Sequence, residues 1–553
     1  MRSLVFGLAA LALPAQLPSL PPSPLAAAEK SLHLLNRLAY GPRVGEAERL
    51  TQGGDAALAA WILAQLSPGR DPALEARLAA YPTLGMDIPA LQKAFPLPTS
   101  AEARQELPPE QRPARIELEL GAGKLLRAVY AERQVEEVLT DFWFNHFNVD
   151  WGKGECKWFV PAYERQAIRP HVFGRFRDLL AATAGHPAML FYLDNWLSTR
   201  EGFDPSRYVR LDDPKGRERL ALEEAARLRD QERRLANRPP TMEQMLREAR
   251  RPQPRKMGLN ENYARELLEL HTMGVDGGYT QQDVREVARC FTGWTLDQPR
   301  QAAVARFRPV AHDPGDKVVL GTRIGLGGVK DGEAVLDLLA RHPATARFIA
   351  TKLCRRFVAD EPPPALVERV AEVFLKTGGE LRQVYASIFF SPEFWSAGAY
   401  LAKVKSPLEF LASALRSLGA EVEDPAPLLR HLARMGQPLY RCAPPIGWKD
   451  TAEAWVSTGT LVNRLQLGLA LGRPQVKAVT WTRQDLAAVP GAPPEAALDH
   501  VARLLLQRPL GPGSRAVLLK DLDGAGKPAD GPAPGEPAKL VGLLLGSPEF
   551  QRR

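Results

Sequence analysis

Apolar residues recur at three- and four-residue spacing, the period of an α-helix, along most of this 553-residue chain. In the stretch 343–358, for example, Ala346, Ile349 and Leu353 fall on one helical face. Alternating, strand-like runs are scarce, so the pattern predicts a mainly α fold. The other clear helical stretches are 31–38, 54–66, 135–149, 259–273 and 281–294.

One region departs from the helical period. The runs AVARFRP (303–309) and KVVLG (317–321) have strand-like composition and flank VAHDPGD. Pro314 and Gly315 in that linking segment favour a turn. We therefore expect a small β-hairpin on a large multi-helical body.

Charge is distributed unevenly along the chain. The segment from about 199 to 256 is rich in Arg, Glu and Asp, and it predicts a charged inserted arm. Elsewhere Lys and Arg are interleaved with Asp and Glu. Although the net charge is +8, this mixture of signs indicates solvated helix faces rather than a nucleic-acid-binding surface. Because no nucleic-acid-binding motif accompanies this charge, we expect no nucleic-acid partner.

The first 28 residues have the order of a secretory signal: Arg2, an apolar run over 4–13, a Pro-rich neck and the small residues 26–28. The apolar run is shorter than the roughly 20 residues that span a bilayer. We expect a signal peptide over 1–28, a helical domain over 29–553, export to the periplasm or the extracellular space, and no transmembrane segment after cleavage. A disordered Ala- and Pro-rich leader is the alternative.

The four cysteines, Cys156, Cys290, Cys354 and Cys442, are widely spaced and include no CxxC pair. Export would permit disulfides. Cys290 and Cys354 lie within apolar helical patterns, so we expect these two thiols to be buried and unreactive.

The stretch NENYARELLELHTM (260–273) sorts its polar residues by helical face. At about 100° per residue, one polar stripe is formed by Asn262, Glu266 and Glu269, while His271 falls on the apolar side. The candidate catalytic residues here are Glu266, Glu269 and His271, and the candidate substrate-binding residues are Asn262 and Arg265. The alternative is a polar joint between two helices.

The segment GVDGGYTQQDV follows directly. Its DGG sequence predicts a turn, and Thr280 with Asp283 has the spacing of a helix cap. The same letters resemble the second half of a calcium-binding loop, although the acidic ligands of the first half are missing. Asp276 is accordingly a candidate ligand for a divalent metal.

The stretch FWFNHF (142–147) surrounds a helix with aromatic residues, which indicates burial. Asn145 and His146 lie on the same helix, and a buried polar group costs about 1–3 kcal/mol unless it is hydrogen-bonded. One interpretation is a structural network. The other is a pocket wall in which Trp143 and Asn145 bind substrate and His146 acts in catalysis.

Three further residues are candidates. His312 and Asp313 lie in VAHDPGD, where a loop carried on a rigid body can present metal ligands, although the same letters are good turn chemistry. Trp294 is a candidate substrate-binding aromatic. The chain contains no HExxH, GxSxG, phosphate-binding glycine loop or dinucleotide fingerprint. This excludes the enzymes that are recognised by these motifs, but not enzymes of the same classes that lack them.

Six stretches resemble, in their order, the bacterial family catalogued as domain of unknown function 1800: HLLNRLAYGP, FWFNHF, NENYARELLELHTMGVDGGYTQQDV, ARCFTGWTL, HDPGDKVVLG and KSPLEF. The resemblance extends from about residue 31 to the C-terminus. It implies a large, often exported protein whose gene often stands beside that of a second exported family, related to sulfatases and phosphatases. It implies no particular reaction.

Three functions remain open. The first is an exported enzyme of the hydrolase or lyase class that acts on a cell-envelope or extracellular polymer through the catalytic candidates above. The second is a non-catalytic binding or maturation partner of an exported sulfatase- or phosphatase-like protein. The third is a polysaccharide-binding protein that uses Trp143, Trp151, Trp158 and Trp294.

Overall fold

Helices account for most of the computed structural model, which describes residues 18–98, 106–203, 258–486, 493–524 and 536–553. In the first half of the chain these helices are α1 (Ala27–Leu38), α2 (Glu46–Gln65), α3 (Pro72–Leu78), α4 (Ile88–Ala94), α6 (Ala114–Tyr130), α7 (Gln134–His146), α8 (Cys156–Tyr163), α9 (Phe176–Ala184), α10 (Pro187–Tyr192), α13 (Asn262–Glu266) and α14 (Gln281–Cys290). Two π-helices, η3 (Glu164–Ile168) and η7 (Leu267–Thr272), follow directly on α8 and α13.

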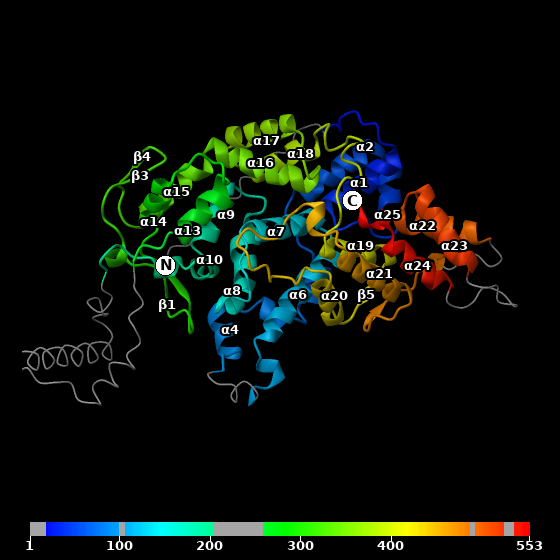
Figure 1. Cartoon of the computed structure of the whole chain (residues 1–553), viewed down its shortest axis with the longest axis horizontal. Coiled ribbons are helices and arrows are strands. Elements are labelled where there is room, and N and C mark those ends of the chain that lie inside the picture. The colour runs from blue at the N-terminus through cyan, green and yellow to red at the C-terminus, as the bar shows by residue number, and fades with distance from the viewer. Residues whose placement is uncertain (1–17, 99–105, 204–257, 487–492, 525–535) are drawn as a thin grey trace, which may run out of the picture.

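The helices of the second half continue the same core. They are α15 (Val329–Ala340), α16 (Pro343–Phe357), α17 (Pro364–Thr377), α18 (Leu381–Phe389), α19 (Pro407–Leu418), α20 (Ala426–Arg434), α21 (Thr458–Gly472), α22 (Pro494–Leu506), α23 (Pro512–Gly524), α24 (Glu536–Gly546) and α25 (Pro548–Gln551). Figure 1 shows α7 in the middle of the molecule, with α16–α18 above it and α19–α21 beside it. The mainly α prediction is therefore confirmed.

Local capping chemistry explains where several helices begin and end. In the KSPLEF motif, Ser406 and Glu409 cap each other's backbone at the start of α19, and Pro407 occupies the first turn. The same helix ends at Gly419, whose φ of 59° is the left-handed conformation that glycine adopts easily. The predicted Thr280–Asp283 cap of α14 is also present.

Several predicted boundaries change. The helix predicted over 54–66 begins earlier, at Glu46, and is kinked at Gly54, which has φ 63° and ψ −163°. The helix predicted over 281–294 stops at Cys290, and Trp294 lies in a strand instead. Gly293 makes this change of direction at φ 82°, where an added Cβ would lie 2.7 Å from the Arg308 carbonyl oxygen.

The described strands form three antiparallel two-stranded ribbons: β1 (Trp294–Asp297) with β2 (Val304–Phe307), β3 (Lys317–Val319) with β4 (Thr322–Ile324), and β5 (Glu421–Val422) with β6 (Val479–Thr480). The predicted pairing of 303–309 with 317–321 is wrong, because each run pairs with a nearer neighbour. Between β3 and β4, Leu320 (φ 50°) and Gly321 (φ 77°) form the two-residue turn that suits a tight hairpin.

The thiol prediction is confirmed, since all four cysteines are free and buried. Burial raises the pKa of the Cys290 thiol to about 12 and that of Cys354 likewise to about 12. Neither thiol is therefore ionised at neutral pH.

The N-terminal part of the described chain packs on the body. Ala27 and Ala28, where the predicted signal cleavage falls, form the first turn of α1. Upstream, Leu25 is buried, and the Ser23 hydroxyl donates a 2.7 Å hydrogen bond to the Trp395 carbonyl. Residues 1–17 of the predicted signal peptide, and the predicted arm from 204 onward, lie outside the described residues. None of the described helices has both the length and the apolar character needed to cross a bilayer.

Candidate functional site

A cavity of about 470 Å³ lies between α7, η7, α16 and the segment 437–455. Pockets of this size are typical of sites for small ligands. The α7 wall is the aromatic stretch singled out in the sequence, the η7 wall contains Glu269, and the α16 wall contains Lys352. Four segments that are distant in sequence therefore meet around one space.

Asn145 and Asn148 hold the segment opposite α7 in place. Asn145 donates to the Trp448 carbonyl (2.8 Å) and accepts from the Trp448 backbone N–H (2.7 Å). Asn148 donates to the carbonyls of Cys442 (2.8 Å) and Pro444 (2.9 Å). Both amides thus bind protein backbone, which supports a structural network for these two residues even though they line the cavity.

Trp143 does not reach the cavity. Its side chain is fully buried, and Nε1 donates to the Tyr385 hydroxyl at 2.6 Å. Trp151 and Trp158 are also buried, so three of the four tryptophans proposed for polysaccharide binding belong to the core. The tryptophans at the cavity are Trp448 and Trp455, whose ring centroids lie 6.0 Å apart.

The cavity tryptophans follow two prolines in a loop, PPIGWKDTAEAW, that does not show a clear periodic pattern. Clustered aromatics in a Pro- and Gly-containing loop were the available signal. The sequence pattern instead favoured tryptophans such as Trp143 and Trp158, which lie in helices and are buried in the core.

His146, which lines the cavity, lies close to His271, which does not line it. His146 Nε2 lies 3.1 Å from the His271 carbonyl, which can only accept, so this nitrogen carries the hydrogen. Nδ1 of His146 is then an acceptor, and it is buried without a partner in the described part of the chain. Burial, and then the charge of Lys352, lowers the pKa of His146 well below its ordinary value and that of His271 to about 3. Both rings are therefore neutral at physiological pH.

The π-winding of η7 separates the predicted acidic pair. The Met273 N–H donates to the Leu268 carbonyl five residues back at 2.8 Å, so the spacing of about 100° per residue does not apply here. Glu269 lines the cavity and accepts a 3.5 Å contact from the Tyr279 hydroxyl. Glu266 is half-buried outside the cavity, where burial and then the charge of Glu269 raise its pKa.

Lys352 is a cavity residue that the sequence pattern does not predict. It projects from α16 into the cavity, and within the described chain it has neither a hydrogen bond nor a carboxylate at ion-pair distance. Its Nζ lies 5.5 Å from the centroid of the Phe348 ring. Burial lowers the pKa of Lys352 to about 8. In the sequence this residue resembles any lysine on the polar face of an amphipathic helix, so no local signal distinguishes it.

Most of the other charges at the cavity are paired. Lys124 contacts Asp141 (2.8 Å) and Glu164 (3.6 Å), and Arg356 contacts Glu409 (2.7 Å). Burial opposes ionisation of Asp450, but the charges of Lys403, Arg356 and Arg553 outweigh it and lower the pKa of Asp450 to about 2. These pairs form the frame of the site, and Lys352 and Glu269 are set into it without ionic partners.

The remaining residues of the predicted substrate site lie elsewhere. Asn262 donates to the Leu193 carbonyl at 3.2 Å, and Arg265 contacts Glu261 (3.4 Å) and Gln281 (2.8 Å). Trp294 packs on Phe291 with ring centroids 5.2 Å apart. None of the three candidates lines the cavity. The contacts of Arg265 link α13 to α14, in agreement with the alternative of a polar joint between helices.

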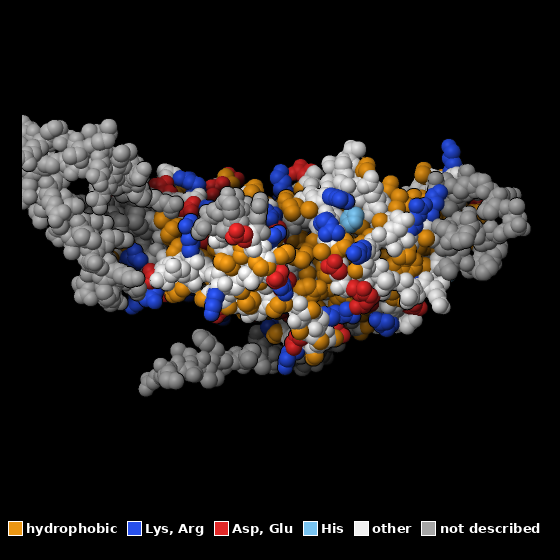
Figure 2. Space-filling view, turned by 90° about the horizontal axis from the view of Figure 1, so that it is seen from below, with side chains coloured by type: hydrophobic (Ala, Val, Ile, Leu, Met, Phe, Trp, Pro, Cys, Tyr) orange, Lys and Arg blue, Asp and Glu red, His pale blue; other side chains and the backbone are white. Residues whose placement is uncertain are grey.

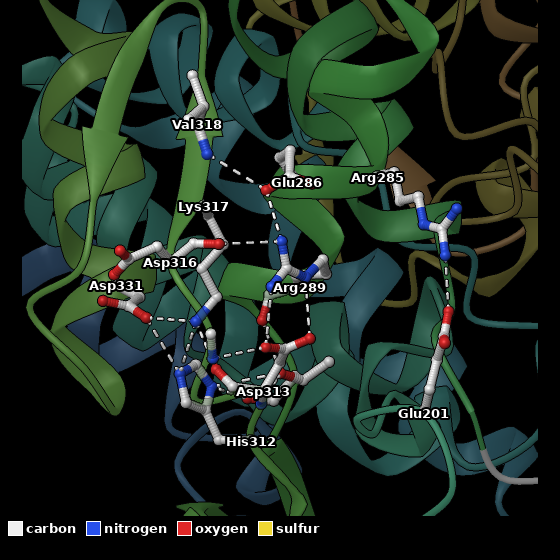
Figure 3. A network of polar contacts seen from close by, with 12 residues as sticks. Glu201, Arg285, Glu286, Arg289, His312, Asp313, Asp316, Lys317, Val318 and Asp331 are labelled. Carbon is white, nitrogen blue, oxygen red and sulfur yellow. Dashed lines mark hydrogen bonds and ion pairs between the residues drawn. The ribbon is translucent and has the colours of Figure 1, made fainter.

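His312 and Asp313 belong to a second polar cluster, the α14–β3 cluster, formed by Glu286, Arg289, His312, Asp313, Lys317 and Asp331 (Figure 3), together with Thr292, which contacts His312 Nδ1 and the Asp313 backbone N–H. Arg289 binds Asp313 through Nε (2.8 Å) and Nη2 (3.0 Å). Lys317 binds Asp331 at 2.7 Å, and His312 Nε2 lies 3.1 Å from the same carboxylate.

Two of the proposed metal ligands, His312 and Asp313, are therefore already bound to other side chains of the α14–β3 cluster. The described residues include no group of three or more His, Cys, Asp or Glu side chains placed to hold a metal ion. Asp276 is exposed on the turn after η7. The metal prediction for His312, Asp313 and Asp276 therefore gains no support from the structure.

A family model described as "Protein of unknown function (DUF1800)" matches residues 33–552, nearly the whole chain. No curated protein and no solved structure matches the chain.

Proposed function

The chain belongs to the DUF1800 family, and we propose that it is an enzyme of the hydrolase or lyase class that binds a segment of a cell-envelope or extracellular polymer in the central cavity. The observation that carries this proposal is that Glu269 and Lys352, on different walls of one cavity, have no ionic partner among the residues that the structure describes. Ionisable groups left unpaired in a cleft are candidates for a functional site.

Each group has a chemical role in this proposal. Hydrolysis and elimination both need a proton donor and a proton acceptor at the reacting bond. Glu269, carried by η7, supplies a carboxylate, and Lys352, carried by α16, supplies an amine whose pKa of about 8 allows it to give or take a proton near neutral pH. His146 has a positioning role in this proposal, because its Nε2–H donates to the carbonyl of His271 and so ties α7 to η7, the element that carries Glu269.

The test is turnover of a panel of neutral and acidic polysaccharides and of bacterial envelope fractions, scored for new reducing ends and for unsaturated ends. Glu269→Gln keeps the shape of the residue and removes its acid–base function, so we expect activity to fall about 10²- to 10⁴-fold. Glu453→Gln is the matched control, because Glu453 also lines the cavity but is exposed and paired with Lys449 at 3.2 Å. Full activity of Glu269→Gln on every polymer that the wild type cleaves would contradict the proposal.

A second function is favoured by the rim of the cavity. Val275 is 67% exposed and Ile446 is 53% exposed, and both line the cavity. Figure 2 shows one face of the molecule on which hydrophobic side chains gather across the middle, between charged groups. Exposed apolar patches mark protein-binding surfaces. The alternative proposal is therefore a non-catalytic partner of an exported sulfatase- or phosphatase-like protein, tested by co-purification of wild type and of Ile446→Asp.

Export remains part of both proposals. A cut N-terminal to Leu20 would leave Ser23 and Leu25 in their contacts with the body, so we place the expected signal cleavage there rather than near Ala28. N-terminal sequencing of the protein recovered from the periplasm or medium checks this. Recovery of the uncut chain from the cytosol alone would contradict export.

A further inference from the structure

We propose that the ligand of the cavity is an amphiphilic anion, with an apolar body and one acidic group, a carboxylate or a phosphate, that binds Lys352. This inference rests on the proposed function only for the location of the site. It names the chemistry of the substrate segment that the cavity holds.

The distribution of charge supports an anion. The charged or titratable groups that line the cavity are Lys124, Asp141, His146, Glu269, Lys352, Arg355, Arg356, Tyr440, Lys449, Asp450 and Glu453. On the α16 wall, Lys352 has no carboxylate partner in the described chain, and the Arg355 side chain donates to the Asp360 carbonyl (3.0 Å) without forming an ion pair. This wall therefore has unneutralised positive charge.

The nearest neighbours of Lys352 do not neutralise it. His146 and His271 are uncharged at neutral pH because burial and Lys352 itself lower their pKa values. Asp450 is the nearby carboxylate that favours the lysine charge, but its contacts are with Lys403 (3.6 Å), Arg356 (3.7 Å) and Arg553 (3.6 Å). An acidic group on the ligand would supply the missing partner, and a bond to a charged group is among the stronger hydrogen bonds.

The surroundings of this charge are apolar. The Phe348 ring lies beside Lys352, and Phe142, Leu270 and Leu439 continue the lining. At the mouth, Trp448 and Trp455 add aromatic surface, and Ile446 is exposed. A ligand that buries apolar area here and places its acidic group at Lys352 satisfies both parts of the lining.

The test compares octanoate, octyl phosphate and octanol by isothermal titration calorimetry on the full chain. We expect at least one of the two anions to bind about tenfold or more tightly than octanol, because only the anions form the charge-assisted bond. Which anion binds more tightly identifies the acidic group. Lys352→Met should remove this preference while leaving octanol binding unchanged.

Lys449→Met is the matched control, because Lys449 lines the same cavity but is exposed and paired with Glu453. It should leave the preference for the anion intact. Equal binding of octanol and both anions by the wild type overturns the proposal without any variant. Retention of the anion preference in Lys352→Met overturns it as well.

The pH dependence separates binding by Lys352 from a structural effect. Anion affinity should fall as the pH rises through about 8, the pKa of Lys352, since the amine then loses its proton. An ordinary lysine would hold the anion to about pH 10.4. The anion titrations and the cleavage assay of Glu269→Gln are independent measurements. The absence of an anion preference would overturn this inference without deciding the cleavage assay, so the proposed function and this inference can fail separately.

Discussion

The cavity and the α14–β3 cluster contain similar side chains in opposite states. In the α14–β3 cluster, Arg289, Lys317 and Asp331 each have a partner at hydrogen-bond distance (Figure 3). At the cavity, Lys352 and Glu269 have no ionic partner among the described residues. Paired buried charges hold elements together, whereas unpaired ones are available to a ligand. The same amino acids therefore serve structure in one region and are candidates for function in the other.

The largest effect should come from breaking a pair in the α14–β3 cluster. Asp331 and Lys317 are each 1% exposed, so Asp331→Ala leaves an uncompensated buried charge. We expect it to lower the free energy of unfolding by about 3–5 kcal/mol. Thermal or urea unfolding measures this.

The control for that variant is Asp316→Ala, because Asp316 forms its ion pair with Arg323 at the surface. A surface pair contributes about 0–1 kcal/mol. If Asp331→Ala were as mild as Asp316→Ala, the α14–β3 cluster would not be structural, and the contrast with the cavity would fail.

A smaller loss is expected at the junction of α7 and the loop that closes the cavity. Gly447 has φ 76°, and a Cβ there would lie 2.3 Å from the Asn145 carbonyl oxygen. Gly447→Ala should therefore lower the free energy of unfolding by about 1–3 kcal/mol, and it should also weaken anion binding by displacing Trp448.

Gly459→Ala is the matched control, because a Cβ at Gly459 meets no atom within 4 Å. Gly459 lies in the first turn of α21, so alanine there should be neutral or stabilising. Unfolding and calorimetry on both variants decide whether the loop is held as described. Equal behaviour of the two would show that the loop tolerates movement.

The smallest effect has the opposite sign. Lys352→Met removes an unpaired, half-buried charge, so at pH 7 it should raise the free energy of unfolding by about 1 kcal/mol. The folded-state pKa of about 8 lies below the ordinary lysine pKa of about 10.4, so the penalty on the wild type is complete below pH 8. Wild-type stability recovers as the pH rises from about 8 towards about 10.4, and the advantage of the variant should disappear over that interval. A destabilised Lys352→Met at pH 7 would place Lys352 among the structural charges.

Local patterns in the sequence predicted most helices well. The 343–358 prediction differs from α16 by one residue, and the Thr280–Asp283 cap is present. These features depend on residues within one or two turns of each other, which is why periodicity and capping rules find them. The strand pairing was wrong because the Leu320–Gly321 turn resembles no common hairpin sequence.

The candidate site was predicted in part. Asn145, His146 and Glu269 do line the cavity, while Trp143 is in the core and Glu266 is outside the cavity. The π-winding of η7 could not be read from a pattern that assumes about 100° per residue. Lys352 had no signal at all, because its lack of a partner is a property of its surroundings.

By itself, the sequence determined the helical class, the caps and the aromatic helix that becomes the α7 wall, because each depends on neighbours along the chain. The tertiary structure alone decided which polar residues are satisfied. The Asn145 side chain binds the Trp448 backbone at a sequence separation of 303 residues. Arg289 binds Asp313, and the β1–β2 ribbon lies between these two residues in the sequence. Whether a charge is paired depends on such long-range contacts, so only the folded chain separates Lys352 from Lys317.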